Sequence, residues 1–305
     1  MALAPSYLEY PKRRHGMDHD YYEWSNLFER PPVSWPGGKS VAIWTLVNLE
    51  WFPITPEDKP FRAPGHMQTP YPDYRHYTAR EYGTRVGFYR LLDAFAKVGV
   101  PMSVAVNSVI AERYPSIIAD IVSAGHEIVA HSVDMNGTIA TGLDEASERE
   151  LILRSIDTLE KIAGVRPRGW HSIARSQSFA TPRLLAEAGL DYMCDWVNDE
   201  LPYRFQTGAG ELINLPLSHE LSDRQILVNQ QQSIHGYAEQ IADAFDLLER
   251  ESRIYGGRML ALNLTPYIIA LPYRITEFEH LLAKLASRPG AWFARGDTIV
   301  DAWSK

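Results

Sequence analysis

The chain has 305 residues and carries 30 Lys and Arg residues against 38 Asp and Glu residues, which gives a formal net charge of -8. This acidic balance, with no long basic run, argues against nucleic acid or an anionic membrane surface as the main partner. The single cysteine, Cys194, excludes an intrachain disulfide and a metal site made of clustered cysteines.

No apolar run approaches the roughly 18 residues of a membrane span. Residues 1–14 also lack the apolar stretch of a signal peptide. We therefore expect a soluble cytoplasmic protein.

The first 39 residues are rich in aromatic residues and proline, among them Tyr21, Tyr22, Trp24 and Trp35. Disordered tails rarely contain so many aromatic residues. We therefore predict that residues 1–39 form an ordered arm packed on the rest of the chain. Residues 40–305 contain no linker rich in Pro, Gly or Ser, and we predict a single domain over this range.

Short apolar runs recur through this domain and are typical of buried strands. They cover residues 40–48, 101–107, 126–131, 169–172, 191–195, 212–216 and 259–264, with an eighth candidate at 291–295. Helical patterns separate most of them, which indicates parallel strands joined by crossover helices. Seven or eight such units favour an α/β fold of the (β/α) barrel type over an open sheet.

Two of the helical patterns have apolar residues at the spacing of one helix face. In the segment 83–98 the residues that would share this face are Val86, Tyr89, Leu92 and Ala96. In the following helix they are Ile152, Ile156, Leu159 and Ala163. Ser147 and Glu150 precede the second face with the spacing of a capping box, which predicts the start of that helix.

Residues 51–82 interrupt this pattern with six prolines and neither helical nor strand periodicity. Loops of this length are usually functional or form interfaces. The segment follows the first strand at its carboxyl end, the edge where barrel enzymes have their active sites. We expect it to cover the mouth of a site and to contact a second subunit in a homodimer or homotetramer.

Polar residues stand at the carboxyl ends of the predicted strands, as a barrel enzyme requires. For each of them the alternative role is a helix cap or a hydrogen bond within a loop. Nucleophile-elbow, P-loop and dinucleotide motifs are missing from the sequence. His126 and His131 would point to opposite faces of a strand and could not share one ion. The polar residues at strand ends are Asn48, Glu50, His131, Ser132, Asp134, His171, Arg175, Asp195, His219, Glu220 and Asp223.

Several multi-residue motifs, in the same order along the chain, resemble the polysaccharide deacetylase (NodB-homology) family. The similarity is greatest to its allantoinase-like and cyclic-imide-hydrolase-like branch. The motifs are Arg30-Pro31-Pro32, Trp35-Pro36-Gly37, Glu81-Tyr82-Gly83-Thr84-Arg85-Val86-Gly87, Gly125-His126-Glu127-Ile128 with His131, Gly169-Trp170 and Asp199-Glu200-Leu201-Pro202-Tyr203. The resemblance implies a distorted (β/α) barrel of about seven parallel strands and hydrolysis of carbon–nitrogen bonds of amide type.

The resemblance also implies an incomplete set of catalytic residues. The position of the general base falls on Asn48, and that of the metal carboxylate falls on Glu50. The two metal histidines fall on His131 and Met135, and the general acid falls on Thr265. Asparagine is not a useful base, and methionine is a weak ligand for a hard divalent ion.

Three functions follow from these observations. The first is hydrolysis of a small cyclic amide, imide or ureide without a metal. Glu50 would be the general base, His131 would protonate the leaving nitrogen or polarise the carbonyl, and Arg175 would stabilise the oxyanion. The predicted substrate contacts are Asn48, Trp51, Arg85, Asp134, Trp170, His171, Asp195, Trp196, Asp223 and Thr265.

The second function is a sugar N-deacetylase that uses a divalent metal such as zinc, for which Glu50, His131 and His171 would be the ligands. The third is a barrel that has lost catalysis and binds a small molecule or a protein.

Overall fold

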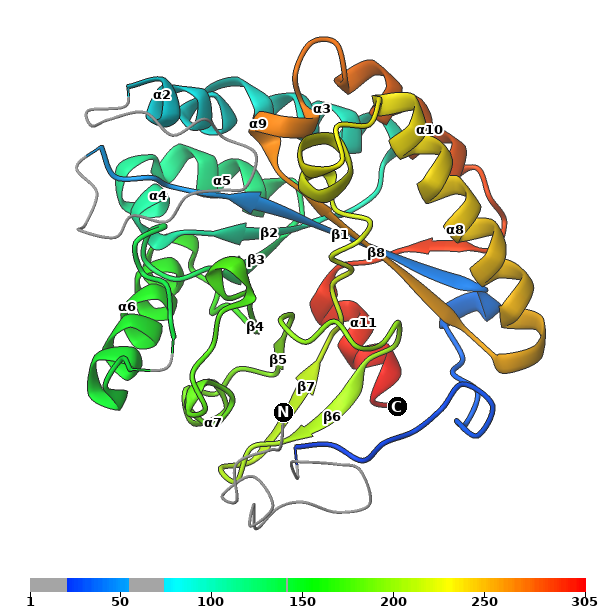
Figure 1. Ribbon diagram of the computed structural model, residues 1–305, viewed down its shortest axis with the longest axis horizontal. Helices are drawn as coiled ribbons and strands as arrows, with labels where there is room; N and C mark the ends of the chain where they lie inside the picture. Colours follow the sequence, from blue (N-terminus) through cyan, green and yellow to red (C-terminus); the bar gives the residue numbers. More distant parts are fainter. Residues whose placement is uncertain (1–20, 55–73, 141) are drawn as a thin grey trace, which may run out of the picture.

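The computed structural model describes residues 21–54, 74–140 and 142–305 (Figure 1). Within these ranges nine strands form one sheet in the order β6-β7-β5-β4-β3-β2-β1-β8, and β9 pairs with β1 beside this path. The strands are β1 (Val41–Leu49), β2 (Ser103–Val106), β3 (Glu127–Ala130), β4 (Gly169–Trp170), β5 (Tyr192–Met193), β6 (Tyr203–Gln206), β7 (Glu211–Asn214), β8 (Arg258–Leu264) and β9 (Ala291–Phe293).

All strand pairs of this sheet are parallel except the antiparallel hairpin of β6 and β7. Each apolar run in the sequence overlaps one of the parallel strands, so the prediction of parallel strands is confirmed, and the eighth candidate is β9. The strand β6 was not predicted. The sheet curls into a half-barrel whose two ends are β6 and β8, which is the distorted barrel that the resemblance implied.

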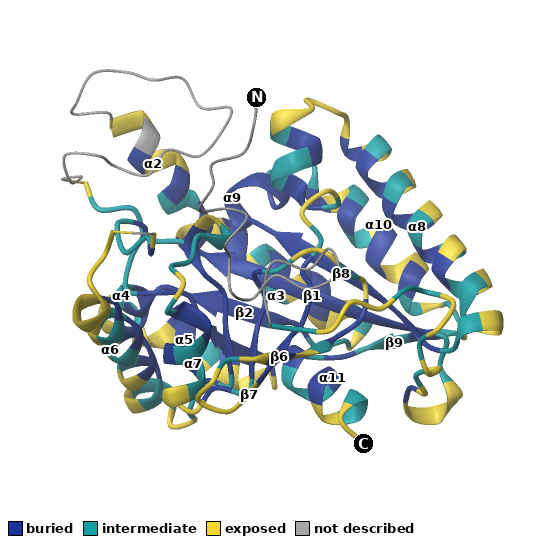
Figure 2. Ribbon diagram, turned by 60° about the horizontal axis from the view of Figure 1, so that its bottom comes forward, coloured by how far each residue is buried: buried dark blue, intermediate teal, exposed yellow. Residues whose placement is uncertain are grey.

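The longest strand, β1, has three strand partners, and all nine of its residues are buried. It pairs with β2 through its carboxyl half, with β8 along most of its length and with β9 at its amino end. Because every residue of β1 is buried, both of its faces are covered, which explains the continuous apolar run at 40–48. Figure 2 shows this buried strand among the more exposed helices.

Helices cover the outer face of the sheet (Figures 1 and 2). The α-helices are α2 (Tyr74–Tyr82), α3 (Phe88–Val98), α4 (Ser108–Arg113), α5 (Pro115–Ser123), α6 (Glu145–Ala163), α7 (Thr181–Glu187), α8 (Ile234–Tyr255), α9 (Pro266–Ile269), α10 (Ile275–Ala286) and α11 (Gly296–Trp303). Two short 3₁₀ helices, η1 (Pro36–Gly38) and η3 (Ile173–Arg175), and two π-helices, η2 (Gly83–Gly87) and η4 (Arg224–Asn229), complete the described part. None of the helices in these ranges is long and apolar enough to cross a membrane.

Of the two predicted helix faces, the one in α6 is confirmed and the one in the segment 83–98 is wrong. In α6, Ile152, Ile156 and Leu159 are buried, so the predicted face is confirmed. The cap of this helix is not the predicted one, because Asp144 is the N-cap residue and accepts a hydrogen bond from the Ser147 backbone NH at 3.0 Å.

In the segment 83–98 the prediction is wrong. Val86 and Tyr89 are exposed, and α3 buries Phe88, Leu91, Ala94 and Phe95 instead. The π-helix η2 precedes α3, and its wider turn rotates the following residues away from the face that regular 3.6-residue spacing predicts.

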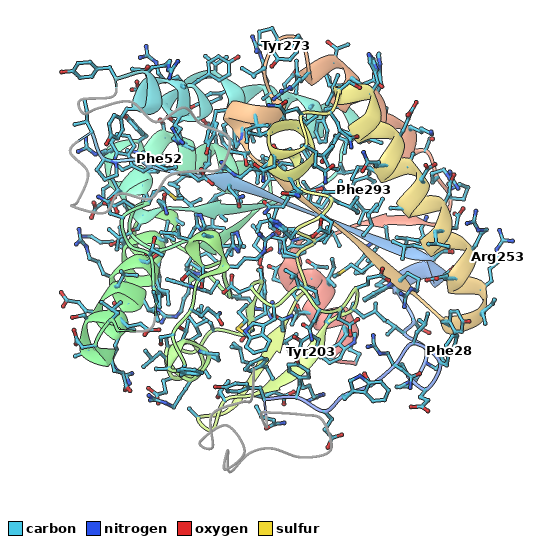
Figure 3. The ribbon with its side chains drawn as sticks, in the orientation of Figure 1. Phe28, Phe52, Tyr203, Arg253, Tyr273 and Phe293 are labelled. Atoms are coloured by element: carbon cyan, nitrogen blue, oxygen red, sulfur yellow. The ribbon has the colours of Figure 1, made fainter. Side chains whose placement is uncertain are left out.

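The described part of the N-terminal arm lies against the two ends of the sheet. The Trp35 indole NH donates to the Arg258 carbonyl oxygen at 2.7 Å, beside β8. The ring of Tyr21 stacks on that of Phe205 in β6, with 4.9 Å between the ring centroids. Phe28 lies near the C-terminal end of α8, which carries Arg253 (Figure 3), and its ring contacts that of Tyr255 at 5.7 Å.

A buried polar cluster lies at the amino ends of the strands. The Glu127 carboxyl group, in β3, receives a hydrogen bond from the Tyr192 hydroxyl at 2.6 Å and one from the Asp297 backbone NH at 3.1 Å. The Gly296 backbone NH donates to the Ser103 hydroxyl at 3.0 Å. These contacts supply acceptors for the first NH groups of α11, which would otherwise be unpaired. Burial raises the pKa of Glu127 to about 7, with a contribution from nearby Asp297.

Candidate active site

The carboxyl ends of the strands surround a cavity of about 320 Å³. Its residues come from the ends of β1, β3, β4 and β8 and from the segment after β7. They are Asn48, Glu50, His131, Met135, His171, Ala174, Arg175, His219, Ser222, Asp223, Arg224, Asn229, Asn263 and Thr265. Most of the polar residues that line this cavity were therefore predicted from the sequence.

His131 follows β3 and is held by His171, which follows β4. Its Nδ1 atom lies 2.6 Å from the His171 backbone carbonyl oxygen, and the two rings stack with 4.9 Å between their centroids. A carbonyl oxygen only accepts hydrogen bonds, so Nδ1 carries the proton and Nε2 presents a lone pair. Burial, together with nearby His171, lowers the pKa of His131 to about 4, so the ring is neutral at pH 7.

Asp195, which follows β5, holds His171 and the residue after it. Its carboxylate accepts hydrogen bonds from the Ser172 backbone NH and hydroxyl, both at 2.8 Å, and from the Gln177 amide at 2.7 Å. The His171 Nδ1 atom lies 3.2 Å from the same carboxylate. Burial alone would raise the pKa of Asp195, but the hydrogen bond and charge of His171 and the bonds from Ser172 lower it. Asp195 is thus occupied by protein groups, and it positions His171.

Glu50, just beyond β1, is an ionised carboxylate. Its two oxygens each lie 3.1 Å from one guanidinium nitrogen of Arg224, and the Tyr267 hydroxyl also donates to it. The Glu50 side chain is only 6% exposed, and burial alone would raise its pKa. The charge of Arg224 and the hydrogen bond from Tyr267 outweigh burial and lower the pKa.

Asp223 is a buried carboxyl group with a different environment. One of its oxygens, Oδ2, accepts a hydrogen bond from the Thr265 backbone NH at 2.6 Å. The other oxygen, Oδ1, is shielded from solvent and has no hydrogen-bond partner. Burial raises the pKa of Asp223 to about 7, although Thr265 and Arg224 act in the opposite direction.

Arg175 enters the cavity from a strained loop. Ala174 and Arg175 have φ angles of 54° and 56°, in the left-handed region that disfavours residues other than glycine, and Ser132 beside His131 has 61°. Such strain is concentrated at functional sites. Arg175 contacts His219 Nδ1 at 3.3 Å and the Leu217 carbonyl oxygen at 3.5 Å, and no carboxylate among the described residues forms an ion pair with it.

Five residues of the cavity each leave one buried polar atom without a hydrogen-bond partner. The atoms are Asn48 Oδ1, His131 Nε2, Arg175 Nε, Asp223 Oδ1 and one terminal guanidinium nitrogen of Arg224. Buried polar atoms are almost always paired in native proteins, because an unpaired one costs about 1–3 kcal/mol. Their concentration around one cavity indicates a binding site for a polar ligand.

These side chains do not fit a divalent metal ion. Glu50 is already engaged by Arg224 and Tyr267, and the position of the second metal histidine is Met135. In the described ranges no three His, Cys, Asp or Glu side chains are grouped closely enough to hold one. Catalytic zinc normally has three protein ligands. Glu50 is therefore bound to a cation of the protein itself.

Six sequence-predicted contacts do not line this cavity, namely Trp51, Arg85, Asp134, Trp170, Asp195 and Trp196. Arg85 is on η2 with a side chain 71% exposed, and Trp170 is fully buried in the core. Asp134 accepts a hydrogen bond from the Asn136 backbone NH at 2.8 Å. Trp196 packs against the arm and donates to Gln177 at 3.0 Å.

Trp51 lies in a neighbouring cavity of about 440 Å³, which also contacts Glu50 and Phe52. Figure 3 shows Phe52 just beyond the end of β1.

Two important residues were missed by sequence reasoning, Arg224 and Tyr267. Both lie beyond the strand ends, in η4 and α9, and reach Glu50 through side-chain length. The only signals in the sequence are their positions, directly after Asp223 and two residues after Thr265.

A curled sheet with polar side chains at the carboxyl ends of its parallel strands is the arrangement in which barrel enzymes have their active sites. Residues 78–193 match the family model described as polysaccharide deacetylase. The chain is 26% identical over 301 residues to a provisionally named polysaccharide deacetylase of Schizosaccharomyces pombe, covering 88% of this chain and 92% of that one. It is 22% identical over 256 residues to the peptidoglycan deacetylase of Helicobacter pylori, covering 73% of this chain and 86% of that one.

The crystal structure of Puue allantoinase superposes with a TM-score of 0.82 at 27% identity, covering 92% of this chain and 96% of that one. The chain is thus similar to the polysaccharide deacetylase family, through the family model over residues 78–193 and through relatives and a solved structure that cover most of its length.

Proposed function

We propose that the protein hydrolyses a non-peptide carbon–nitrogen bond in a small cyclic amide, imide or ureide, without a bound metal. The observation that carries this proposal is the set of five unpartnered polar atoms around the cavity. A volume of about 320 Å³ suits a small ring rather than a polymer.

The unpartnered atoms match the polar groups of such a ring. Arg175 and Arg224 offer donors for carbonyl oxygens, and Asn48 Oδ1 and His131 Nε2 offer acceptors for an N–H group and a water molecule. In cyclic imides and ureides, carbonyl oxygens and N–H groups alternate around one small ring, so acceptors and donors lie close together. A ligand of this class would satisfy atoms that the protein alone leaves unpaired.

His131 is the proposed general base. Its Nε2 lone pair can take a proton from a water molecule that attacks the ring carbonyl carbon, and the neutral tautomer is set by the bond from Nδ1 to His171. The proton that it receives is stabilised by the Glu50 carboxylate, whose charge raises the pKa of His131 against the effect of burial. The low pKa means that the base is unprotonated throughout the neutral range.

Arg175 is the proposed oxyanion contact. As water adds, negative charge develops on the carbonyl oxygen, and a guanidinium group already fixed in a dry cavity stabilises it. The strained backbone at Ala174 and Arg175 holds this group in place. The absence of a carboxylate partner for Arg175 among the described residues leaves its charge available to the substrate.

His131 thus takes the role of general base that the sequence suggested for Glu50. A carboxylate already paired with Arg224 and Tyr267 is a poor base, and a histidine whose only proton is donated to a carbonyl oxygen is a poor acid. Glu50 instead holds Arg224 in the cavity and supplies negative charge beside His131. The similarity to Puue allantoinase, whose name gives allantoin, a cyclic ureide, as its substrate, supports the same class of substrate.

The test is turnover of a panel of five- and six-membered cyclic imides, ureides and lactams, with N-acetylated sugars as the competing class. We expect ring opening of at least one cyclic compound, with the same rate after treatment with a chelator. Release of acetate from a sugar, lost on chelation, would favour a metal-dependent deacetylase. Binding of the rings without turnover of any compound would instead favour a barrel that has lost catalysis.

A further inference from the structure

A ring-opening hydrolase also needs a group that gives a proton to the leaving nitrogen, because an amide anion is a very poor leaving group. Among the residues that line the cavity, the histidines at strand ends do not fit this role. His131 donates its one proton to the His171 carbonyl oxygen, and His171 faces Asp195 through Nδ1. His219 also lines the cavity but is exposed to solvent.

The carboxyl groups differ in how their oxygens are used. Glu50 is bound by Arg224 and Tyr267, and Asp195 accepts hydrogen bonds from Ser172 and Gln177. Asp223 accepts a hydrogen bond from the Thr265 backbone NH through Oδ2, and the Thr265 side chain and the Arg224 backbone also act on its carboxyl group, but its Oδ1 atom has no hydrogen-bond partner. Asp223 is thus the carboxyl group in the cavity with an oxygen available to a ligand.

The surroundings of Asp223 favour its protonated form at the start of the reaction. It is 1% exposed, and its pKa is raised to about 7 by burial. The charged group facing it is Arg224, the next residue, whose cation is shared with Glu50. Tyr237, from α8, also faces Asp223. Its phenol is neutral, because burial and the charge of Asp223 both raise its pKa. Thr265, from the end of β8, donates its backbone NH to Asp223, and its side chain also lowers the pKa of that carboxyl group.

We propose that Asp223 is the catalytic acid of this site and that its Oδ1 atom carries the proton delivered to the leaving nitrogen. This inference rests on the proposed function. It assigns protonation of the leaving nitrogen, which neither His131 nor Glu50 can perform.

The step balances as follows. Water forms the new C–O bond and gives one proton to His131 Nε2, and Arg175 holds the resulting oxyanion. The C–N bond then breaks as the oxyanion re-forms the carbonyl group, and the electron pair of that bond takes the proton from Asp223. His131 later returns its proton through the product and solvent, and Asp223 is reprotonated. One water molecule is consumed for each bond broken.

The first experiment compares Asp223→Asn with wild type on rings that differ in the basicity of the leaving nitrogen. Asparagine keeps an oxygen for the Thr265 backbone NH but has no acidic proton. We expect kcat to fall about 100- to 10,000-fold for a ureide or lactam, whose nitrogen must be protonated as it leaves. For an activated imide, whose nitrogen departs as a stable anion, we expect a loss of less than about tenfold.

The matched control is Glu239→Gln, an exposed carboxyl group on α8 that does not line the cavity, and it should leave both rates unchanged. An equal loss on both classes of ring would mean a structural role for Asp223 and would overturn the proposal. Unchanged rates in Asp223→Asn would overturn it as well, while turnover by wild type would leave the proposed function intact. If wild type opens none of these rings, the proposed function fails and the assignment of Asp223 falls with it.

A second measurement does not depend on turnover. Infrared difference spectra between wild type and Asp223→Asn at pH 6 should contain a protonated-carboxyl band that is lost above neutral pH. Glu127 is present in both proteins, so its own protonated carboxyl cancels in the difference. A spectrum with only an ionised carboxylate at pH 6 would overturn the proposal even if the variant folds poorly.

Discussion

The Nδ1 atom of His131 lies 2.6 Å from the His171 backbone carbonyl oxygen, and this one contact decides what the histidine can do. Because the carbonyl can only accept, the other ring nitrogen must be the acceptor that faces a substrate. A ring of the same kind without this contact would interconvert between tautomers. The backbone just after β4 therefore sets the chemistry of the side chain that follows β3.

Replacement of His131 by alanine should lower kcat/KM about 100- to 10,000-fold, as expected for loss of a general base. In wild type, activity should persist as the pH falls from 7 to 5, since the pKa of His131 is lowered to about 4 and the base stays unprotonated. Rate measurements across this range check both points. His280→Ala, at a side chain 71% exposed, is the control and should be neutral. A steep loss of activity below pH 6 would contradict the assignment.

Glu50→Gln should destabilise the fold by about 3 kcal/mol at pH 7, because it leaves Arg224 as a buried cation without its partner. The pKa of Glu50 is lowered in the folded protein, so its contribution is present above the ordinary carboxyl pKa. This contribution is lost as the pH falls through the lowered value, and the gap between variant and wild type should narrow in acid.

Denaturant unfolding at pH 7 and in acid gives both quantities. Asp93→Asn, which breaks the exposed pair with Lys97, is the control and should change stability by less than about 0.5 kcal/mol. A Glu50→Gln protein as stable as wild type at pH 7 would argue against a buried ion pair.

Glu127 should show the opposite pH dependence. Its pKa is raised by burial from 4.5 to about 7, so the folded protein binds more protons than the unfolded chain between these values. Stability attributable to Glu127 is thus present below pH 4.5 and declines as the pH rises to about 7, by on the order of 3 kcal/mol. Glu127→Gln lacks this titration, so its stability relative to wild type should increase from pH 5 to pH 8. Unfolding curves for both proteins at the two pH values test this, and parallel behaviour would contradict it.

Gly169 lies where no side chain fits. A Cβ atom on this first residue of β4 would overlap the buried ring of Tyr192, whose hydroxyl is bound to Glu127. We expect Gly169→Ala to cost at least about 1–3 kcal/mol, because overpacking in the core forces such shifts. Gly236→Ala near the start of α8, where a Cβ would meet only flexible side chains at 3.3 and 3.5 Å, should be neutral or stabilising. Thermal unfolding of both variants makes the comparison.

Most of the sheet could be predicted because its strands are buried on both faces and appear as continuous apolar runs. β6 could not, since its pattern of exposed and buried residues in Tyr203–Gln206 is that of a short edge strand. The same limit applies to the site. Strand ends placed His131 and Asp223 at one cavity, but the pairing of Glu50 with Arg224 depends on how η4 folds back over β1. Local spacing does not contain that information.

Because the half-barrel is open, the residues of the site lie on two parts of the chain that are held in different ways. Glu50, His131 and His171 follow strands that are locked to one another by continuous hydrogen bonding from β1 to β4. The segment 217–231, with Asp223 and Arg224, emerges from β7 near the free edge at β6. In a closed barrel the stagger of each strand is constrained by all the others. An open sheet does not have this constraint. Insertions or deletions in 217–231 would therefore leave β1 to β4 in register, so a change in the length of this one segment would reshape the cavity without disturbing the strands that precede Glu50, His131 and His171.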